Sequence, residues 1–325
     1  MALGPKKIHE VMDLAWTART NGDTFNVMLK GEAGLGKSEV LQQWAQKKRE
    51  EFGEFHILDL RLAYLESPDI IGFPKEVQHD GRWRTIHALP GFWPVDPDSK
   101  GMLLLEEINR GTTGVMNTMM QLLTDRKILS DDPSYPDYIL PDGWIICAAV
   151  NPDSAQYDVN SMDQALSDRF VQFDVGYNHN EFVKYIKQQE WHRNVVNYIQ
   201  SGAWTYKESG SIARDNSAMY ISPRTWSRVN AAERAGAGDE GSRTLHRSIV
   251  QALLGKHIGE EYHKMCYDDS PVLASDLIKD FDGAIKKLKQ LSKKSSYAGD
   301  KVAVTVDSIC DSYQGWYEDL SLIHI

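Results

Sequence analysis

The sequence predicts an α/β fold: a parallel, five-stranded αβα core, followed by a smaller, all-helical domain. Two observations predict it. In the first half of the chain, apolar runs of strand length alternate with helical patterns, which is typical of buried parallel strands. After about residue 178 the strand-like runs stop and only helical patterns continue. The five expected strands are residues 25–29, 56–60, 102–105, 144–150 and 170–175.

The first helix is expected at residues 8–20, where apolar residues recur three and four positions apart until a turn signal at Asn21-Gly22. Ligands of parallel sheets bind at the carboxyl ends of the strands, so we expect functional residues there. Further helices are expected at residues 39–48, 115–124, 180–189, 195–201, 222–235, 244–255 and 275–294.

Two stretches interrupt the strand–helix rhythm. Residues 67–100 are rich in proline, glycine and aromatic residues, and residues 127–143 have the composition of a hairpin or a long loop. Long ordered loops in a compact domain are usually functional.

Composition narrows the function classes. The 325 residues carry a net charge of −10, which argues against nucleic-acid binding by the whole surface but leaves a local basic groove open. The three cysteines lie far apart, and no disulfide framework is indicated. His263 and Cys266 are three residues apart, but no second ligand pair follows, so this spacing alone does not predict a metal site. Without a membrane-length apolar run or a signal-peptide core in residues 1–7, we expect a cytoplasmic protein.

A complete phosphate-binding loop lies between the first expected strand and the second helix. Its glycines let backbone N–H groups turn inward, and the following helix N-terminus attracts phosphate. Lys37 adds a positive charge, and the Ser38 hydroxyl is a hard oxygen ligand suited to Mg²⁺. The chain is therefore expected to bind a nucleoside triphosphate together with Mg²⁺; the family resemblance given below implies that the nucleotide is ATP. The loop consists of Gly31, Glu32, Ala33, Gly34, Leu35, Gly36, Lys37 and Ser38.

Polar residues follow two other expected strands. The apolar run 102–105 ends in Glu106 and Glu107. In that position Glu106 would hold Mg²⁺ through water, and Glu107 would orient the attacking water or accept its proton. Asn151 ends the 144–150 run, where its amide can hydrogen-bond both the water and the γ-phosphate.

Two arginines complete the candidate set. Arg169 lies in an Asp-Arg-Phe sequence just before the last expected strand. Arg224 follows Ser222 and Pro223, which are expected to begin a helix. A cation is mildly unfavourable in a first helical turn, so a phosphate partner would explain why Arg224 stands there. A surface salt bridge is the alternative for each of the two arginines.

The order of these motifs resembles that of the AAA+ ATPases, and more narrowly of their MoxR-type branch, over residues 8 to 255. The resemblance implies that Asn151 is the sensor-1 residue, that Arg169 is an arginine finger acting on a neighbouring subunit, and that Arg224 is the sensor-2 arginine. The branch markers are Glu107-Ile108-Asn109-Arg110, Pro68-Asp69-Ile70-Ile71-Gly72, Leu140-Pro141-Asp142-Gly143-Trp144 and Ser222-Pro223-Arg224-Thr225-Trp226.

The resemblance also implies an organisation and partners. Residues 1–178 would be the ATP-binding core, with a pore-facing helix-2 insert at 67–100 and a pre-sensor-1 hairpin at 127–143. Residues 179–260 would be a helical lid. The resemblance does not extend to residues 261–325, which we expect to be a helical extension of unknown role. Such proteins form rings, commonly hexamers, and this branch acts on protein clients with a von Willebrand factor A domain partner.

Glu106 departs from the family's pattern, which usually has Asp as the first acid of the pair. Its longer side chain makes slow turnover one expectation, whereas Glu107 predicts hydrolysis. Our interpretation is an ATPase that remodels a protein client. The alternatives are a nucleic-acid motor, a GTP-driven translocator, and a nucleotide-gated scaffold with little turnover.

Overall fold

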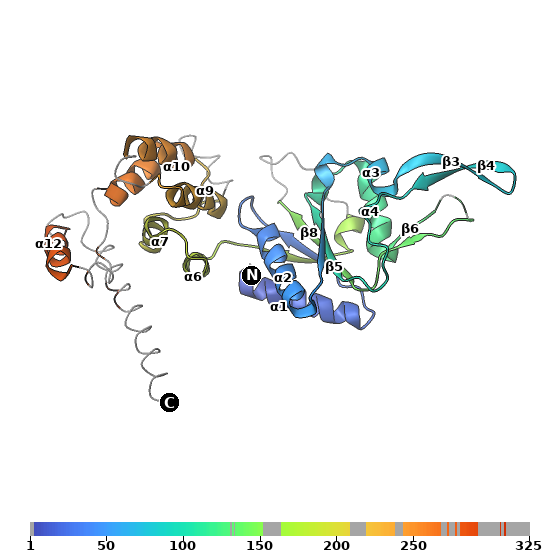
Figure 1. The fold of residues 1–325 in the computed structure, drawn as a ribbon, viewed down its shortest axis with the longest axis horizontal. Helices are drawn as coiled ribbons and strands as arrows, with labels where there is room; N and C mark the ends of the chain where they lie inside the picture. The colour runs from blue at the N-terminus through green and yellow to red at the C-terminus, as the bar shows by residue number, and fades with distance from the viewer. Residues whose placement is uncertain are drawn as a thin grey trace, which may run out of the picture. The chain divides into compact units, whose positions relative to one another are not determined.

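The computed structural model describes residues 3–130, 132, 134–151, 164–208, 219–237, 243–267, 272, 277, 280–291, 306 and 309. The chain divides into two compact units, residues 1–177 and 178–325 (Figure 1). In the part of the chain that the structure describes, no helix is both long and apolar enough to cross a bilayer.

The first unit contains a five-stranded, wholly parallel sheet with the strand order β2-β5-β8-β1-β9. The predicted α/β class, with a helical region following the sheet, is therefore confirmed. The strands are β1 (Val27–Lys30), β2 (His56–Arg61), β5 (Gly101–Glu106), β8 (Trp144–Val150) and β9 (Val171–Asp174).

Alternate side chains of the central strands enter two separate cores. On one face, α1 (Pro5–Thr20) and α2 (Lys37–Phe52) pack on Val27, Leu104 and their neighbours. The other face packs against α4 (Thr113–Asp125) and the residues around it. Because β8 is buried on both faces, all seven of its residues are buried, which explains its unbroken apolar run.

Residues 67–100 are more regular than their composition indicates. They form a short helix, α3 (Ser67–Ile71), and an antiparallel hairpin of β3 (Phe73–His79) and β4 (Arg82–Ala88) (Figure 1). The hairpin predicted as one option for 127–143 is present as β6 (Lys127–Ile128) and β7 (Tyr138–Ile139).

These two hairpins are joined by an ion pair. The Arg84 guanidinium donates from Nη1 to both carboxylate oxygens of Asp132, at 2.8 and 2.9 Å, and to the Ser134 hydroxyl. Asp132 is itself buried. The two interruptions of the fold are thus connected to each other.

The second unit is helical in the part that the structure describes. At Gly255 the backbone has φ 74° and ψ 169°, so α10 consists of two segments that meet at a sharp turn. The helices of the second unit are α6 (His179–Gln188), α7 (Arg193–Gln200), α9 (Pro223–Arg234), α10 (Arg243–Tyr267) and α12 (Phe281–Leu291).

The first unit also contains three short helical connections. They are the 3-10 helices η1 (Leu62–Tyr64) and η2 (Ile108–Arg110) and the α-helix α5 (Gln164–Ser167).

Candidate nucleotide-binding site

The phosphate-binding loop connects β1 to α2. Gly34 and Gly36 have φ of 81° and 86°, a conformation that favours glycine. A side chain at Gly31 would place its Cβ 2.6 Å from the Val175 carbonyl oxygen. The loop therefore requires glycine for its own curvature at two positions and for close packing on the end of β9 at a third.

Lys37 is the first residue of α2 and is largely buried. Its ammonium group donates to the carbonyl oxygens of Gly31 at 2.7 Å and Glu32 at 3.0 Å. It also donates to the Asn151 side-chain oxygen at 3.1 Å, across 114 positions of sequence. The structure thus brings the predicted phosphate-binding lysine and the predicted sensor residue into direct contact.

The predicted acidic pair lies at the carboxyl end of β5, beside the end of β8. Glu107 adopts a left-handed backbone, with φ 54°, and its N–H donates to the Ala149 carbonyl oxygen. Non-glycine residues in this region store strain and cluster at functional sites. The bend separates the two carboxylates: Glu106 lies 3.5 Å from Arg61 Nε, and Glu107 accepts a hydrogen bond from Arg110.

Asn109 was predicted only as part of a family marker, without a role of its own. It lies in η2 and is buried, and its side-chain amide donates to the Asn151 carbonyl oxygen at 3.1 Å. This bond links the turn after the acidic pair to the end of β8. Arg110, which pairs with Glu107, was likewise named only within that marker, and Arg61, which pairs with Glu106, was not singled out from the sequence.

Arg169 lies away from this group of residues. It precedes β9, whose first residue is level with Val27 at the start of β1, whereas the phosphate loop follows the end of β1. Its guanidinium bonds to the Thr124 hydroxyl at 2.6 Å and to the Ala165 carbonyl oxygen. Arg169 therefore lies at the amino ends of the strands, whereas the phosphate loop of its own chain lies at their carboxyl ends.

Arg224 belongs to the second unit. Ser222 and Thr225 form a capping box at the start of α9, and Pro223 occupies the first turn. Arg224 follows Pro223 and its side chain is exposed. It forms no ion pair with any residue that the structure describes, so the surface salt bridge considered from the sequence is not seen there.

The residues present fit a nucleotide with Mg²⁺. Backbone N–H groups of the loop, the α2 N-terminus and Lys37 supply positive charge for phosphate oxygens. Ser38 and Glu106 supply the hard oxygen atoms that Mg²⁺ prefers. Asp59, also near this end of the sheet, has a pKa raised by burial and by the Glu106 charge, so carboxylates are crowded here.

Comparison with known proteins agrees with this geometry. Residues 26–170 match the family described as AAA domain (dynein-related subfamily). The match begins just before β1 and ends just before β9, so it includes the phosphate loop, the acidic pair and Asn151. Residues 26–170 are thus similar to an AAA domain, and they contain four of the five sheet strands together with the phosphate loop. No curated protein matches the sequence.

Solved structures of similar shape include a variant of RuvB from Thermotoga maritima, with 13% identity and a TM-score of 0.43, covering 81% of this chain and 70% of that one. Another is a candidate ATPase from Cytophaga hutchinsonii ATCC 33406, with 18% identity and a TM-score of 0.37, covering 72% and 80%. We infer no function from these two similarities.

Proposed function

We propose that the chain is a Mg²⁺-dependent ATPase whose active sites form between subunits of a ring, commonly a hexamer in the MoxR-type branch. The observation that carries the proposal is the contact of Lys37 with Asn151, beside the acidic pair at the ends of three parallel strands. Such an arrangement provides phosphate binding, metal binding and water activation within one site.

In this proposal each residue has one task. Lys37 leaves the loop carbonyls and binds the β- and γ-phosphates. Glu107 takes the proton of the attacking water, and Asn151, released by Lys37, orients that water against the γ-phosphate. Ser38 and Glu106 would hold Mg²⁺, which would neutralise charge on the phosphates.

Arg169 and Arg224 do not belong to the group of residues at the carboxyl ends of the strands, and each would reach a nucleotide from elsewhere. Because Arg169 lies at the amino ends of the strands, away from its own phosphate loop, it fits an arginine finger offered to a neighbouring subunit. A closed ring satisfies every such site. Arg224 keeps the role that the resemblance implies, that of a lid arginine sensing the γ-phosphate.

We further propose that the ring remodels a protein client, working with a von Willebrand factor A domain partner. The supporting observation is the exposure of large apolar side chains on the β3–β4 hairpin, where Phe73 is 67% and Trp83 is 70% exposed. Exposed aromatic residues of this kind mark protein-interaction sites.

A nucleic-acid motor is less well supported by the same hairpin. Arg82, Arg84 and His87 could meet phosphates, but Arg84 is neutralised by Asp132. Binding to DNA that weakens steeply with added salt would favour the motor. Binding that is absent at low salt would leave the protein client as the proposal.

The first experiment is steady-state ATP hydrolysis by the wild-type chain and by Glu107→Gln, over a series of protein concentrations, with GTP as competitor. We expect turnover per chain to rise with concentration and to vanish in Glu107→Gln, which should still bind ATP. ATP binding without turnover in either protein would contradict the ATPase and favour the scaffold. Equal turnover at every concentration would contradict sites shared between subunits.

A further inference from the structure

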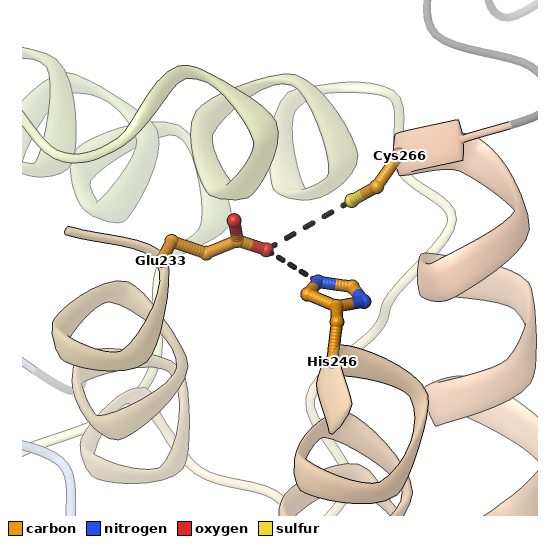
Figure 2. A group of neighbouring side chains, drawn as sticks. All are labelled: Glu233, His246 and Cys266. Atoms are coloured by element: carbon orange, nitrogen blue, oxygen red, sulfur yellow. Dashed lines mark hydrogen bonds and ion pairs between the residues drawn. The ribbon is translucent and has the colours of Figure 1, made fainter. Parts of the chain in front are cut away.

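A second group of chemically reactive side chains lies in the helical unit. Gly255 lets the two segments of α10 pack side by side, and a Cβ at Gly259 would approach the Val250 carbonyl oxygen to 2.7 Å. This close antiparallel packing places His246 on the first segment opposite His263 and Cys266 on the second. Glu233, near the end of α9, points at the same place (Figure 2).

Three of these side chains converge on one point. The Glu233 Oε1 atom lies 2.8 Å from His246 Nε2 and 3.9 Å from Cys266 Sγ, and the three atoms lie within 4.8 Å of one another. Glu233 is 3% exposed and His246 is 0% exposed. A carboxylate, an imidazole and a thiol are the three ligand types that bind Zn²⁺ most often.

The spacing of the three atoms suits one tetrahedral ion. Zinc bonds of ~2.0 Å to oxygen or nitrogen and ~2.3 Å to sulfur separate neighbouring ligand atoms by about 3.3–3.5 Å. The observed separations of 2.8 and 3.9 Å lie on either side of that range. The third separation, from His246 Nε2 to Cys266 Sγ, is within 4.8 Å, so binding the ion requires small rotations of these side chains.

Two of the three residues, Glu233 and His246, also have outer hydrogen-bond partners. Tyr262 donates its hydroxyl to Glu233 Oε1 at 2.6 Å, and Asn194 donates to the other carboxylate oxygen at 3.5 Å. His246 Nδ1 lies 2.8 Å from His263 Nδ1. With its proton on Nδ1, His246 would donate to His263 and present an unprotonated Nε2 inward. Such partners orient metal ligands and fix the tautomer.

The charges of the three side chains also favour binding of a divalent cation. A buried carboxylate is costly unless it is paired. A Zn²⁺ ion bound by one carboxylate, one thiolate and one neutral imidazole forms a group with no net charge. Cys266 is partly exposed, whereas Glu233 and His246 are buried.

We propose that Glu233, His246 and Cys266 form a Zn²⁺ site that joins α9 to both segments of α10. Three protein ligands leave one coordination position for water. Binding releases the Cys266 thiol proton to solvent and requires neither an oxidant nor a reductant. The site belongs wholly to the helical unit and does not depend on the proposed ATPase activity.

The test is to titrate Co²⁺ and Zn²⁺ into the full chain, purified without a histidine tag and stripped of metal, in the absence of nucleotide. We expect one Co²⁺ per chain, a thiolate-to-cobalt charge-transfer band, and displacement of Co²⁺ by one Zn²⁺. In Cys266→Ala the band should be lost and Zn²⁺ affinity should fall ~100-fold or more. This variant leaves the Tyr262 and His246 contacts of Glu233 in place.

His257→Gln is the matched control, because His257 is an exposed histidine of the same helix. It should bind Co²⁺ like the wild type. A second readout is thermal unfolding: Zn²⁺ should raise the melting temperature of the wild type but not that of Cys266→Ala. Co²⁺ binding without a thiolate band, or Zn²⁺ binding equal in wild type and Cys266→Ala, would overturn the proposal and leave a hydrogen-bonded cluster only.

Discussion

At the scale of the residue, Asn109 is the group that connects the acidic pair to Asn151. Its amide donates to the backbone of Asn151, whose side chain in turn accepts from Lys37. Asn109 does not touch the phosphate loop itself, so it would act as a positioning residue. Its donor nitrogen sets where the end of β8 lies relative to the turn that carries Glu107.

We expect Asn109→Asp, which keeps the shape but loses the donor, to lower kcat for ATP hydrolysis ~10–100-fold while leaving KM nearly unchanged. The measurement is steady-state kinetics alongside nucleotide binding. Thr118→Ala, a change at a half-buried position on α4, is the control and should leave both constants unaltered. A rise in KM with kcat preserved would show that Asn109 supports binding and not the placement of Asn151.

Residues that belong to a local sequence motif could be predicted. Pairings between residues far apart in the sequence could not, because they depend on how the strands and helices are aligned. The loop glycines, Lys37 and the acidic pair follow from a motif and its flanks. The pairing of Arg61 with Glu106 depends on the register of β2 against β5. Likewise, His263 and Cys266 are visible as a spaced pair, but Glu233 and His246 join them only because α10 turns at Gly255.

At the scale of the element, the Arg84–Asp132 ion pair connects the two hairpins, beside a ring contact of His79 with Tyr135. The Arg84 hydrogen bonds, together with the Ser134 N–H, lower the pKa of Asp132 to about 2. Because the folded pKa is below the ordinary value of 3.8, the pair contributes fully above that pH and is lost as pH falls towards 2.

Asp132→Asn removes the ion pair at neutral pH and should free the β3–β4 hairpin from the β6–β7 hairpin. We expect faster amide hydrogen exchange in residues 73–88, with the core strands unchanged. Glu76→Gln, an exposed change on β3 itself, is the matched control. Unchanged exchange in Asp132→Asn would mean that the hairpins are held together by other contacts.

Elements that bury an apolar face were predictable, and elements that do not were missed. The five strands and the helices between them follow the apolar runs closely. The β3–β4 hairpin was missed because most of its residues are exposed and it begins with Phe73-Pro74. The helical segment after Gly255 was missed because its buried residues are mainly glycine, tyrosine and histidine, which carry no clear apolar period.

At the scale of the whole molecule, the chain carries two separate chemical centres. The nucleotide site belongs to the first unit and the Glu233 cluster to the second. The succession of strands along the chain and the order of the motifs can be predicted from one chain. A site that borrows a residue from another subunit cannot be seen in a single chain, and only the position of Arg169 points to it.

Mixing two inactive variants tests whether Arg169 acts between subunits. Arg169→Ala keeps its own phosphate loop and should lose ~10³-fold or more in kcat. A Lys37→Ala subunit cannot hydrolyse ATP at its own phosphate loop, but it still supplies Arg169 to the site of its neighbour. In an equal, random mixture within rings, about a quarter of the sites would combine an intact loop with a neighbour's arginine, so about a quarter of wild-type turnover should return.

A mixture of Lys37→Ala with Glu107→Gln is the matched control. Both changes lie at the same edge of the sheet, so no subunit in that mixture has an intact loop and an intact acid together, and turnover should stay absent. Recovery in the first mixture alone would assign Arg169 to the neighbour's site. If neither mixture recovers although mixed rings form, Arg169 does not act in trans, and its bonds to Thr124 and Ala165 would be its whole role, that of holding α4 and α5 together.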